Sequence, residues 1–90
     1  MSITQSVSIV NKLGLHARAS ARLTQTASRF AAKITVRKDQ KEVNAKSIMG
    51  VMMLAAPMGG TITFSAEGED AEEAIMALVA LVENKFGEEE

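Results

Sequence analysis

The sequence predicts a two-layer α+β domain in which three helices pack on one face of a four-stranded sheet. Four short segments alternate apolar and polar residues, as half-buried strands do, and three segments repeat apolar residues at helical spacing. The length suits a single domain spanning residues 1–90. Because helices must bury their apolar stripes, one sheet is the obvious partner for all three. The predicted order is β-α-β-β-α-β-α, and spacing alone leaves the strand order open.

The first two elements are a strand and a long helix. Apolar residues alternate with serines in the strand predicted over residues 3–10. Gly14 then permits a sharp loop. A helix is predicted over residues 17–29, because apolar residues recur there on one side. Its buried stripe contains Ala19, Leu23, Ala27 and Phe30.

The middle of the chain predicts two strands and a short helix. Ile34 and Val36 alternate with polar residues in the second strand, and a polar turn leads to a third strand around residues 42–45. Ser47 is a suitable N-cap for a helix that continues to about Ala55. A proline two residues later stops that helix.

The last elements are a strand, a helix and an acidic tail. Alternation predicts the fourth strand over residues 62–66, and Asp70 with Glu73 forms a D-x-x-E capping pattern for the helix. The expected inner face of this helix contains Ile75, Leu78, Val79, Val82 and Phe86. Gly87 is placed to end the helix, and we expect residues 88–90 to form a flexible, solvated tail.

The composition excludes several kinds of protein. No cysteine is present, which rules out disulfides and thiolate metal sites. The N-terminal residues lack the basic flank and continuous apolar run of a signal peptide, and no stretch approaches the ~18 apolar residues of a membrane span. We therefore expect a cytoplasmic chain that needs no cofactor or metal and does not insert into membranes.

The charges are distributed unevenly along the chain. Residues 1–46 contain nine basic and two acidic residues, a balance of +7, whereas residues 47–90 contain one basic and nine acidic residues, a balance of −8. These charges form either an ordinary solvated surface or a basic patch of Arg18, Arg22 and Arg29 that steers an acidic protein partner. Nucleic acid is a poorer partner, because the chain has no Trp or Tyr for base stacking and a net charge of −1.

His16 is the only histidine and the best candidate for chemistry. It lies between the first strand and the first helix, in Gly-Leu-His-Ala-Arg at residues 14–18. Histidine, with an unperturbed pKa of about 6.5, is mostly neutral at neutral pH, and its free nitrogen can attack phosphorus. Helix-start amides favour an anion there, and Arg18 adds a permanent cation. The alternative is an ordinary loop histidine, whereas a metal site or a Ser-His-Asp site lacks the other residues it needs.

Two separated motifs give the chain a family resemblance. Asn-Lys-Leu-Gly-Leu-His-Ala-Arg-Ala-Ser at residues 11–20 resembles the active-site segment of HPr, the histidine-containing phosphocarrier family of the bacterial phosphoenolpyruvate-dependent sugar phosphotransferase system. Lys-Ser-Ile-Met-Gly-Val-Met at residues 46–52 resembles the regulatory-serine segment of that family. The resemblance covers nearly all of the chain. It implies an open-faced β-sandwich, with three helices on one side of an antiparallel sheet.

The resemblance also implies that the chain is a phosphoryl carrier and not an enzyme. His16 would accept phosphate through Nδ1 from phosphorylated enzyme I and pass it to EIIA-type acceptor proteins in sugar uptake and its regulation. Ala17 and Arg18 would bind the phosphoryl group, with Arg18 stabilising it. HPr kinase/phosphorylase would phosphorylate Ser47, although the residues alone require only an N-cap there. The chain shows no strong sign of oligomerisation, so a monomer is expected.

We expect an apolar docking surface near His16. Some of the methionines at positions 49, 52 and 53 belong to the core, but a helix beside one sheet cannot bury all its sides. The predicted partner-binding residues are Ala17, Ala21, Ile48, Met49 and Met52, with Gln25 and Ser28 at the edge. Phosphate on Ser47 would add about −1.5 to −2 charges to this surface and weaken docking.

Two departures from the family pattern leave the partners open. Many relatives have proline where this chain has Ala19, and asparagine where it has Leu13. Alanine is a good helix former, so the first change should matter little, whereas the second removes a polar contact to the phosphoryl site. The Asn-Lys-Leu-Gly form also resembles the nitrogen-branch relative NPr. The alternatives are therefore a nitrogen-branch carrier, or a non-catalytic regulatory module switched by phosphorylation of Ser47.

Overall fold

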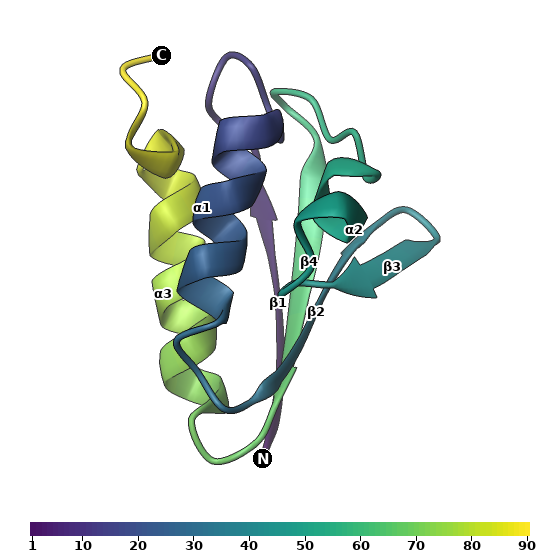
Figure 1. Cartoon of the computed structure of the whole chain (residues 1–90), viewed down its shortest axis with the longest axis vertical. Helices are drawn as coiled ribbons and strands as arrows, with labels where there is room; N and C mark the ends of the chain where they lie inside the picture. The colour runs from purple at the N-terminus through teal and green to yellow at the C-terminus, as the bar shows by residue number, and fades with distance from the viewer.

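The computed structural model describes residues 1–90 as one four-stranded antiparallel sheet with helices over one face (Figure 1). The strands are β1 (Ser2–Ser8), β2 (Lys33–Lys38), β3 (Lys41–Asn44) and β4 (Thr61–Glu67). The helices are α1 (Ala17–Ala27), α2 (Ile48–Met52) and α3 (Ala71–Glu83), followed by the 3₁₀ turn η1 (Lys85–Gly87). The predicted fold class and element order are confirmed. None of the helices combines the length and the apolar character needed to cross a membrane.

The strand order, which spacing left open, is β1-β4-β2-β3. β4 lies between β1 and β2 and pairs antiparallel with both, so that Phe64 is opposite Gln5 on one side and Val36 on the other. β2 and β3 form a hairpin whose turn contains Asp39 at φ +56°. β4 is the last of the four strands along the chain, and it is the strand that joins β1 to the β2–β3 hairpin. The sheet is therefore complete only once residues 61–67 have joined it.

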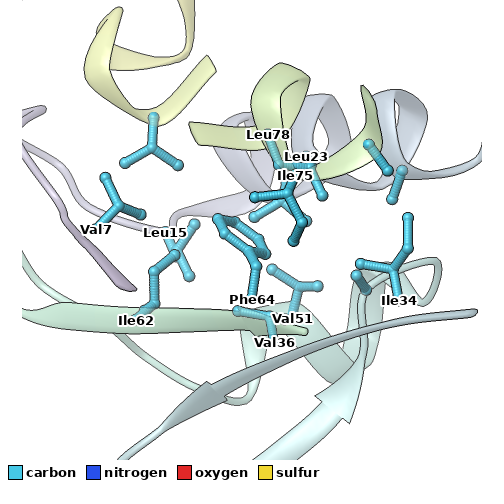
Figure 2. Close-up of a cluster of buried hydrophobic side chains, with 14 of the residues drawn as sticks. Val7, Leu15, Leu23, Ile34, Val36, Val51, Ile62, Phe64, Ile75 and Leu78 are labelled. Atoms are coloured by element: carbon cyan, nitrogen blue, oxygen red, sulfur yellow. The ribbon is translucent and has the colours of Figure 1, made fainter. Parts of the chain in front are cut away.

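The core lies between the sheet and the helices. Figure 2 shows Phe64 projecting from β4 toward Leu23 of α1 and Ile75 of α3. All three side chains are buried, and burying a side chain of this kind contributes about 1.5–3 kcal/mol. The opposite face of the sheet carries hydroxyl pairs such as Ser6 with Thr63, whose oxygens are 2.8 Å apart. One face of the sheet is therefore apolar and covered, and the other is polar and open.

Helix α1 ends two residues earlier than predicted. Its last residue is Ala27, and the C-cap Ser28 donates its backbone N–H to Thr24 O. Phe30, expected in the helical stripe, lies beyond the helix and is half-buried against the core. The rest of the predicted stripe, Ala19, Leu23 and Ala27, is fully buried.

Helix α2 begins where predicted but ends earlier. Ser47 is its N-cap, and Ser47 Oγ accepts a hydrogen bond from Gly50 N at 3.1 Å. The last helical residue is Met52, not Ala55. Ala55 has a left-handed φ of +50°, which is incompatible with a continuing right-handed helix.

The predicted capping box at the start of α3 is wrong. Asp70 stands at the N-cap position but makes no side-chain hydrogen bond to its own helix. Its carboxylate instead accepts hydrogen bonds from Ala31 N and Ala32 N, each at 2.8 Å. The carboxylate therefore ties the start of α3 to the segment between α1 and β2. Along the predicted inner face of α3, Ile75, Leu78 and Val82 are buried and Val79 is half-buried.

The chain turns sharply after α3, where one continuous helix to Gly87 was predicted. The helix ends at Glu83, and Lys85 and Phe86 adopt left-handed φ values of +58° and +56°. This conformation costs an L-residue roughly 1–2 kcal/mol, which the complete burial of Phe86 offsets. The turn carries residues 88–90 to the loop before α1.

Candidate functional site

His16 occupies the N-cap position of α1, at the end of the loop that follows β1. Its backbone is extended, with φ −72° and ψ −178°, and its carbonyl accepts a hydrogen bond from Ser20 N at 2.9 Å. The side chain keeps 29% of its surface exposed. The ring can therefore be reached from solvent while its backbone is fixed to the start of a helix.

The loop before His16 is held against the segment that precedes β4. Leu15 is buried, and its N–H donates to Ala56 O at 2.9 Å. Gly14 has φ +65°, and a Cβ added there would lie 2.4 Å from the same Ala56 oxygen. Only glycine fits this close approach, so the predicted sharp loop at Gly14 is also a tightly packed one.

The first turn of α1 leaves backbone amides without helical partners. The N–H groups of Ala17, Arg18 and Ala19 precede the bond that Ser20 makes to His16 O. Ala17 and Arg18 are exposed, whereas Ala19 is buried against the core. No acidic residue occupies this turn. The amides and the helix dipole therefore favour an anion beside the His16 ring.

The C-terminal segment places Glu88 against the ring. His16 Nε2 is hydrogen-bonded to Glu88 Oε2, and the other carboxylate oxygen, Oε1, accepts from Asn11 Nδ2 at 2.9 Å. Asn11 Nδ2 also donates to Gly14 O at 2.9 Å. The side chain of Glu88 is only 15% exposed. One buried amide thus joins the loop, the carboxylate and, through it, the imidazole.

These surroundings hold the pKa of Glu88 below its ordinary value of 4.5. Burial alone would raise this pKa. The hydrogen bonds from Asn11 and His16, together with the electrostatic attraction of His16 and Arg22 for the carboxylate, lower it by more. Glu88 is therefore ionised at neutral pH and can only accept hydrogen bonds.

A shallow hollow surrounds the exposed edge of the ring. It is lined by the loop and first turn of α1 on one side and by the C-terminus on the other: Lys12, Leu13, His16, Ala17, Arg18, Glu88, Glu89 and Glu90. Arg18 is exposed and forms no ion pair within the chain, so its guanidinium is available to an anion in the hollow. The structure thus brings His16, Ala17 and Arg18 together, with Leu13 exposed at the rim.

The basic patch considered for α1 is only partly free. Arg22 is half-buried and donates a hydrogen bond to Phe86 O, so it holds the C-terminal turn. The Arg29 guanidinium lies 5.9 Å from the centre of the Phe30 ring, beyond the far end of α1. Arg18 is the arginine of this set that lies beside His16.

Helix α2 lies beside α1 (Figure 1). Several of its apolar side chains are exposed. Met49 is 76% exposed, and Ile48 and Met52 are each about two-fifths exposed. Of the other predicted docking residues, Ala17 is exposed and Ala21 is half-buried. The edge residues Gln25 and Ser28 are exposed, and Ser47 is half-buried at the start of α2.

Asn11 and Glu88 belong to this site although neither was predicted as a site residue. Asn11 lies in the 11–20 motif, whereas no sequence pattern singles out Glu88. Asn11 is fully buried, and its Oδ1 has no hydrogen-bond partner. Nothing in a run of three glutamates distinguishes the first from the other two. The chain contains no group of three or more His, Asp or Glu side chains placed to hold a metal ion.

Comparison with known proteins gives this geometry a family. The family model described as "PTS HPr component phosphorylation site" matches residues 3–84, which run from β1 to the end of α3. The chain belongs to the HPr family. HPr proteins are phosphocarriers of the phosphotransferase system, and the resemblance inferred from the two sequence motifs is confirmed.

Individual HPr relatives match the chain almost from end to end. The phosphocarrier protein HPr of Cupriavidus necator is 52% identical, covering 98% of this chain and 99% of its own length. The crystal structure of HPr-C-His from Thermoanaerobacter tengcongensis has 56% identity and a TM-score of 0.93, covering 98% of this chain and 99% of that one. The phosphocarrier protein NPr of Shewanella violacea is 46% identical over 96% of this chain and 94% of its own length. Proteins named HPr and a protein named NPr therefore both occur among the relatives.

Proposed function

We propose that His16 carries the phosphoryl group, taking it through Nδ1 from phosphorylated enzyme I and passing it to EIIA-type acceptor proteins in sugar uptake and its regulation. The observation that carries this proposal is the position of the only histidine, partly exposed at the N-terminus of an 11-residue helix. A phosphoryl anion on the ring is favoured by the helix dipole and the unpaired amides. The open hollow suits direct transfer between two proteins.

Arg18 and the amides of the first turn stabilise the transferred group in this proposal. The guanidinium is permanently charged and can donate two parallel hydrogen bonds to phosphoryl oxygens. Since Arg18 and Ala17 are exposed, solvent screens these interactions and keeps them moderate. A relay needs such moderate stabilisation, because a phosphohistidine held too tightly would not pass its group onward.

In this proposal the chain is a cytoplasmic monomer that acts in the sugar branch of the phosphotransferase system. Identity to the HPr of C. necator exceeds identity to the NPr of S. violacea, 52% against 46%. The nitrogen branch is the second candidate, and the Asn-Lys-Leu-Gly form of residues 11–14 favours it. Measuring transfer from a sugar-type and a nitrogen-type enzyme I side by side separates the two. A markedly faster reaction with the nitrogen-type donor would reassign the branch.

Ser47 is proposed as a second, regulatory phosphorylation site for HPr kinase/phosphorylase. Its hydroxyl caps α2 through Gly50 N, so a phosphate there remains near helix amides that tolerate the charge. The same phosphate adds about −1.5 to −2 charges beside the exposed Ile48 and Met49 of the proposed docking surface. Ser47→Asp should therefore weaken binding to enzyme I in calorimetric titration while the circular dichroism spectrum stays native. Unchanged affinity would remove the case for this switch.

The function is tested by incubating the chain with phosphoenolpyruvate and enzyme I. Intact-mass analysis should show one added phosphate on the wild type, lost on mild acid treatment as expected for phosphohistidine. His16→Ala should gain no phosphate, whereas Ser47→Ala, the control, should gain the same acid-labile phosphate as the wild type. Phosphate uptake by a folded His16→Ala variant would refute the carrier role of His16.

A further inference from the structure

We infer that Glu88 is a positioning residue for phosphoryl transfer, because its carboxylate holds the Nε2–H of His16 and leaves Nδ1 free as the nucleophile. This inference rests on the function proposed above. It deepens that function by giving a task to the C-terminal segment, which lies outside both sequence motifs.

The carboxylate that contacts the ring is itself held in place. One oxygen bonds to His16 Nε2, and the other accepts from Asn11 Nδ2 at 2.9 Å. Asn11 is fully buried, and Glu88 is only 15% exposed, whereas Glu89 and Glu90 are exposed. Surface ion pairs are commonly mobile and contribute little. Here a buried amide fixes the direction of the carboxylate.

The backbone that delivers Glu88 is held by contacts with the rest of the fold. Lys85, Phe86 and Gly87 have φ values of +58°, +56° and +81°, which brings the chain back after α3. The first two are not glycine, so surrounding contacts must maintain their conformation. Phe86 is fully buried, and its carbonyl accepts a hydrogen bond from Arg22 of α1. Glu88 N donates to Lys85 O at 2.9 Å and closes the turn.

The contact selects one of the two ring nitrogens. An ionised carboxylate only accepts hydrogen bonds, so the hydrogen of the neutral imidazole lies on Nε2. The lone pair is then on Nδ1, which makes no hydrogen bond within the chain and does not cap α1. The hydrogen bond of one ring nitrogen thereby sets the tautomer and the orientation of the other.

The same contact compensates the charge that develops during transfer. The Nδ1 lone pair forms the new N–P bond while the bond between phosphorus and the donor atom breaks, and the donor atom keeps that bond's electron pair. The proton on Nε2 stays in place, so the ring gains a positive charge. Glu88 neutralises this charge, as a buried carboxylate does for an imidazolium in other catalytic sites. Because the two nitrogens point away from each other, the carboxylate lies across the ring from the phosphoryl group.

Nitrogen NMR of the His16 ring tests the positioning without any partner protein. At neutral pH the neutral ring of the wild type should be almost entirely the Nε2–H tautomer. Glu88→Ala should show averaging with the Nδ1–H tautomer, and Glu88→Gln, whose amide oxygen can still accept, should retain part of the preference. Glu89→Ala is the matched control, because Glu89 is exposed and adjacent in sequence. Tautomer shifts that are unchanged in Glu88→Ala would overturn the inference.

Transfer kinetics from phosphorylated enzyme I complete the test. Glu88→Ala should lower kcat/KM about tenfold to hundredfold, the range expected for losing one hydrogen bond to a charged group. Glu72→Ala, which changes an exposed glutamate of α3 outside the hollow, should leave kcat/KM unchanged. A normal rate in folded Glu88→Ala would also overturn the inference. If the wild type accepts no phosphate, the proposed function fails, and the transfer role of Glu88 fails with it. The tautomer spectra need no partner protein, so they show separately whether the contact between Glu88 and His16 positions the ring.

Discussion

Replacing Gly14 with alanine tests how firmly the loop before His16 is held. A Cβ added at Gly14 would lie 2.4 Å from Ala56 O and 3.0 Å from Pro57 Cα. Both are backbone atoms, so no side-chain rotation can relieve the contact. Ala56 O also accepts the hydrogen bond of Leu15 N at 2.9 Å, and the new methyl group would push these two segments apart.

The expected loss has two parts. Alanine at φ +65° costs roughly 1–2 kcal/mol for its left-handed backbone. Forcing an extra methyl group into a packed contact, with strain on a buried hydrogen bond, costs about 1–3 kcal/mol more. We therefore expect Gly14→Ala to lower the free energy of unfolding by about 3 kcal/mol, which lowers Tm by about 12–24 °C in a domain of this size.

Gly59→Ala is the matched control for this substitution. Gly59 also has a positive φ, +88°, but nothing lies within 4 Å of an added Cβ. It should lose only the conformational part, about 1–2 kcal/mol. Urea unfolding followed by circular dichroism measures both variants against the wild type. Equal losses at the two positions would refute the claim that close packing at Gly14 fixes the loop.

Three further predictions concern other contacts. Asp70→Ala should lower the free energy of urea unfolding by about 2 kcal/mol, because two backbone amides lose their acceptor. Glu69→Ala changes an exposed neighbour and should alter it by less than about 0.5 kcal/mol. Similar losses in the two variants would contradict the role of the Asp70 carboxylate in holding Ala31 and Ala32. Arg18→Ala should slow phosphate uptake about tenfold or more with a native melting curve, while Arg29→Ala should leave the rate unchanged; a normal rate for the first variant would refute its role. The pKa of Glu88 is lower in the folded than in the unfolded chain, so the ionised carboxylate stabilises the fold. The wild type should therefore have a higher free energy of unfolding than Glu88→Gln above pH 4.5, and this difference should disappear as the pH falls below the folded pKa. A difference that does not depend on pH would contradict this.

Local periodicity, together with turn and cap residues, was sufficient to predict the four strands and the three α-helices, but not the ends of those helices or the 3₁₀ turn η1. It was insufficient for the strand order, since the pairing of β4 with β1 and β2 depends on contacts between distant segments. Asp70 shows a second limit. Its D-x-x-E pattern correctly indicates a helix start, but its carboxylate bonds to Ala31 and Ala32, residues that no local pattern connects to it.

The candidate site was predictable where it consists of neighbours in sequence. His16, Ala17 and Arg18 belong to one helix start, so their proximity follows from the position of α1 alone. Glu88 was not predictable, because it reaches the ring only through left-handed backbone at Lys85 and Phe86. Neither residue is a glycine that would indicate such a turn, and the burial that maintains it is a tertiary contact.

The central claim is that one particular nitrogen of the chain carries the phosphoryl group. After reaction of the ¹⁵N-labelled chain with phosphoenolpyruvate and enzyme I, NMR of the nitrogen–phosphorus coupling locates the new bond directly. The coupling should appear at Nδ1 of His16. Phosphorus on Nε2, on another residue, or absent from the chain would contradict the claim.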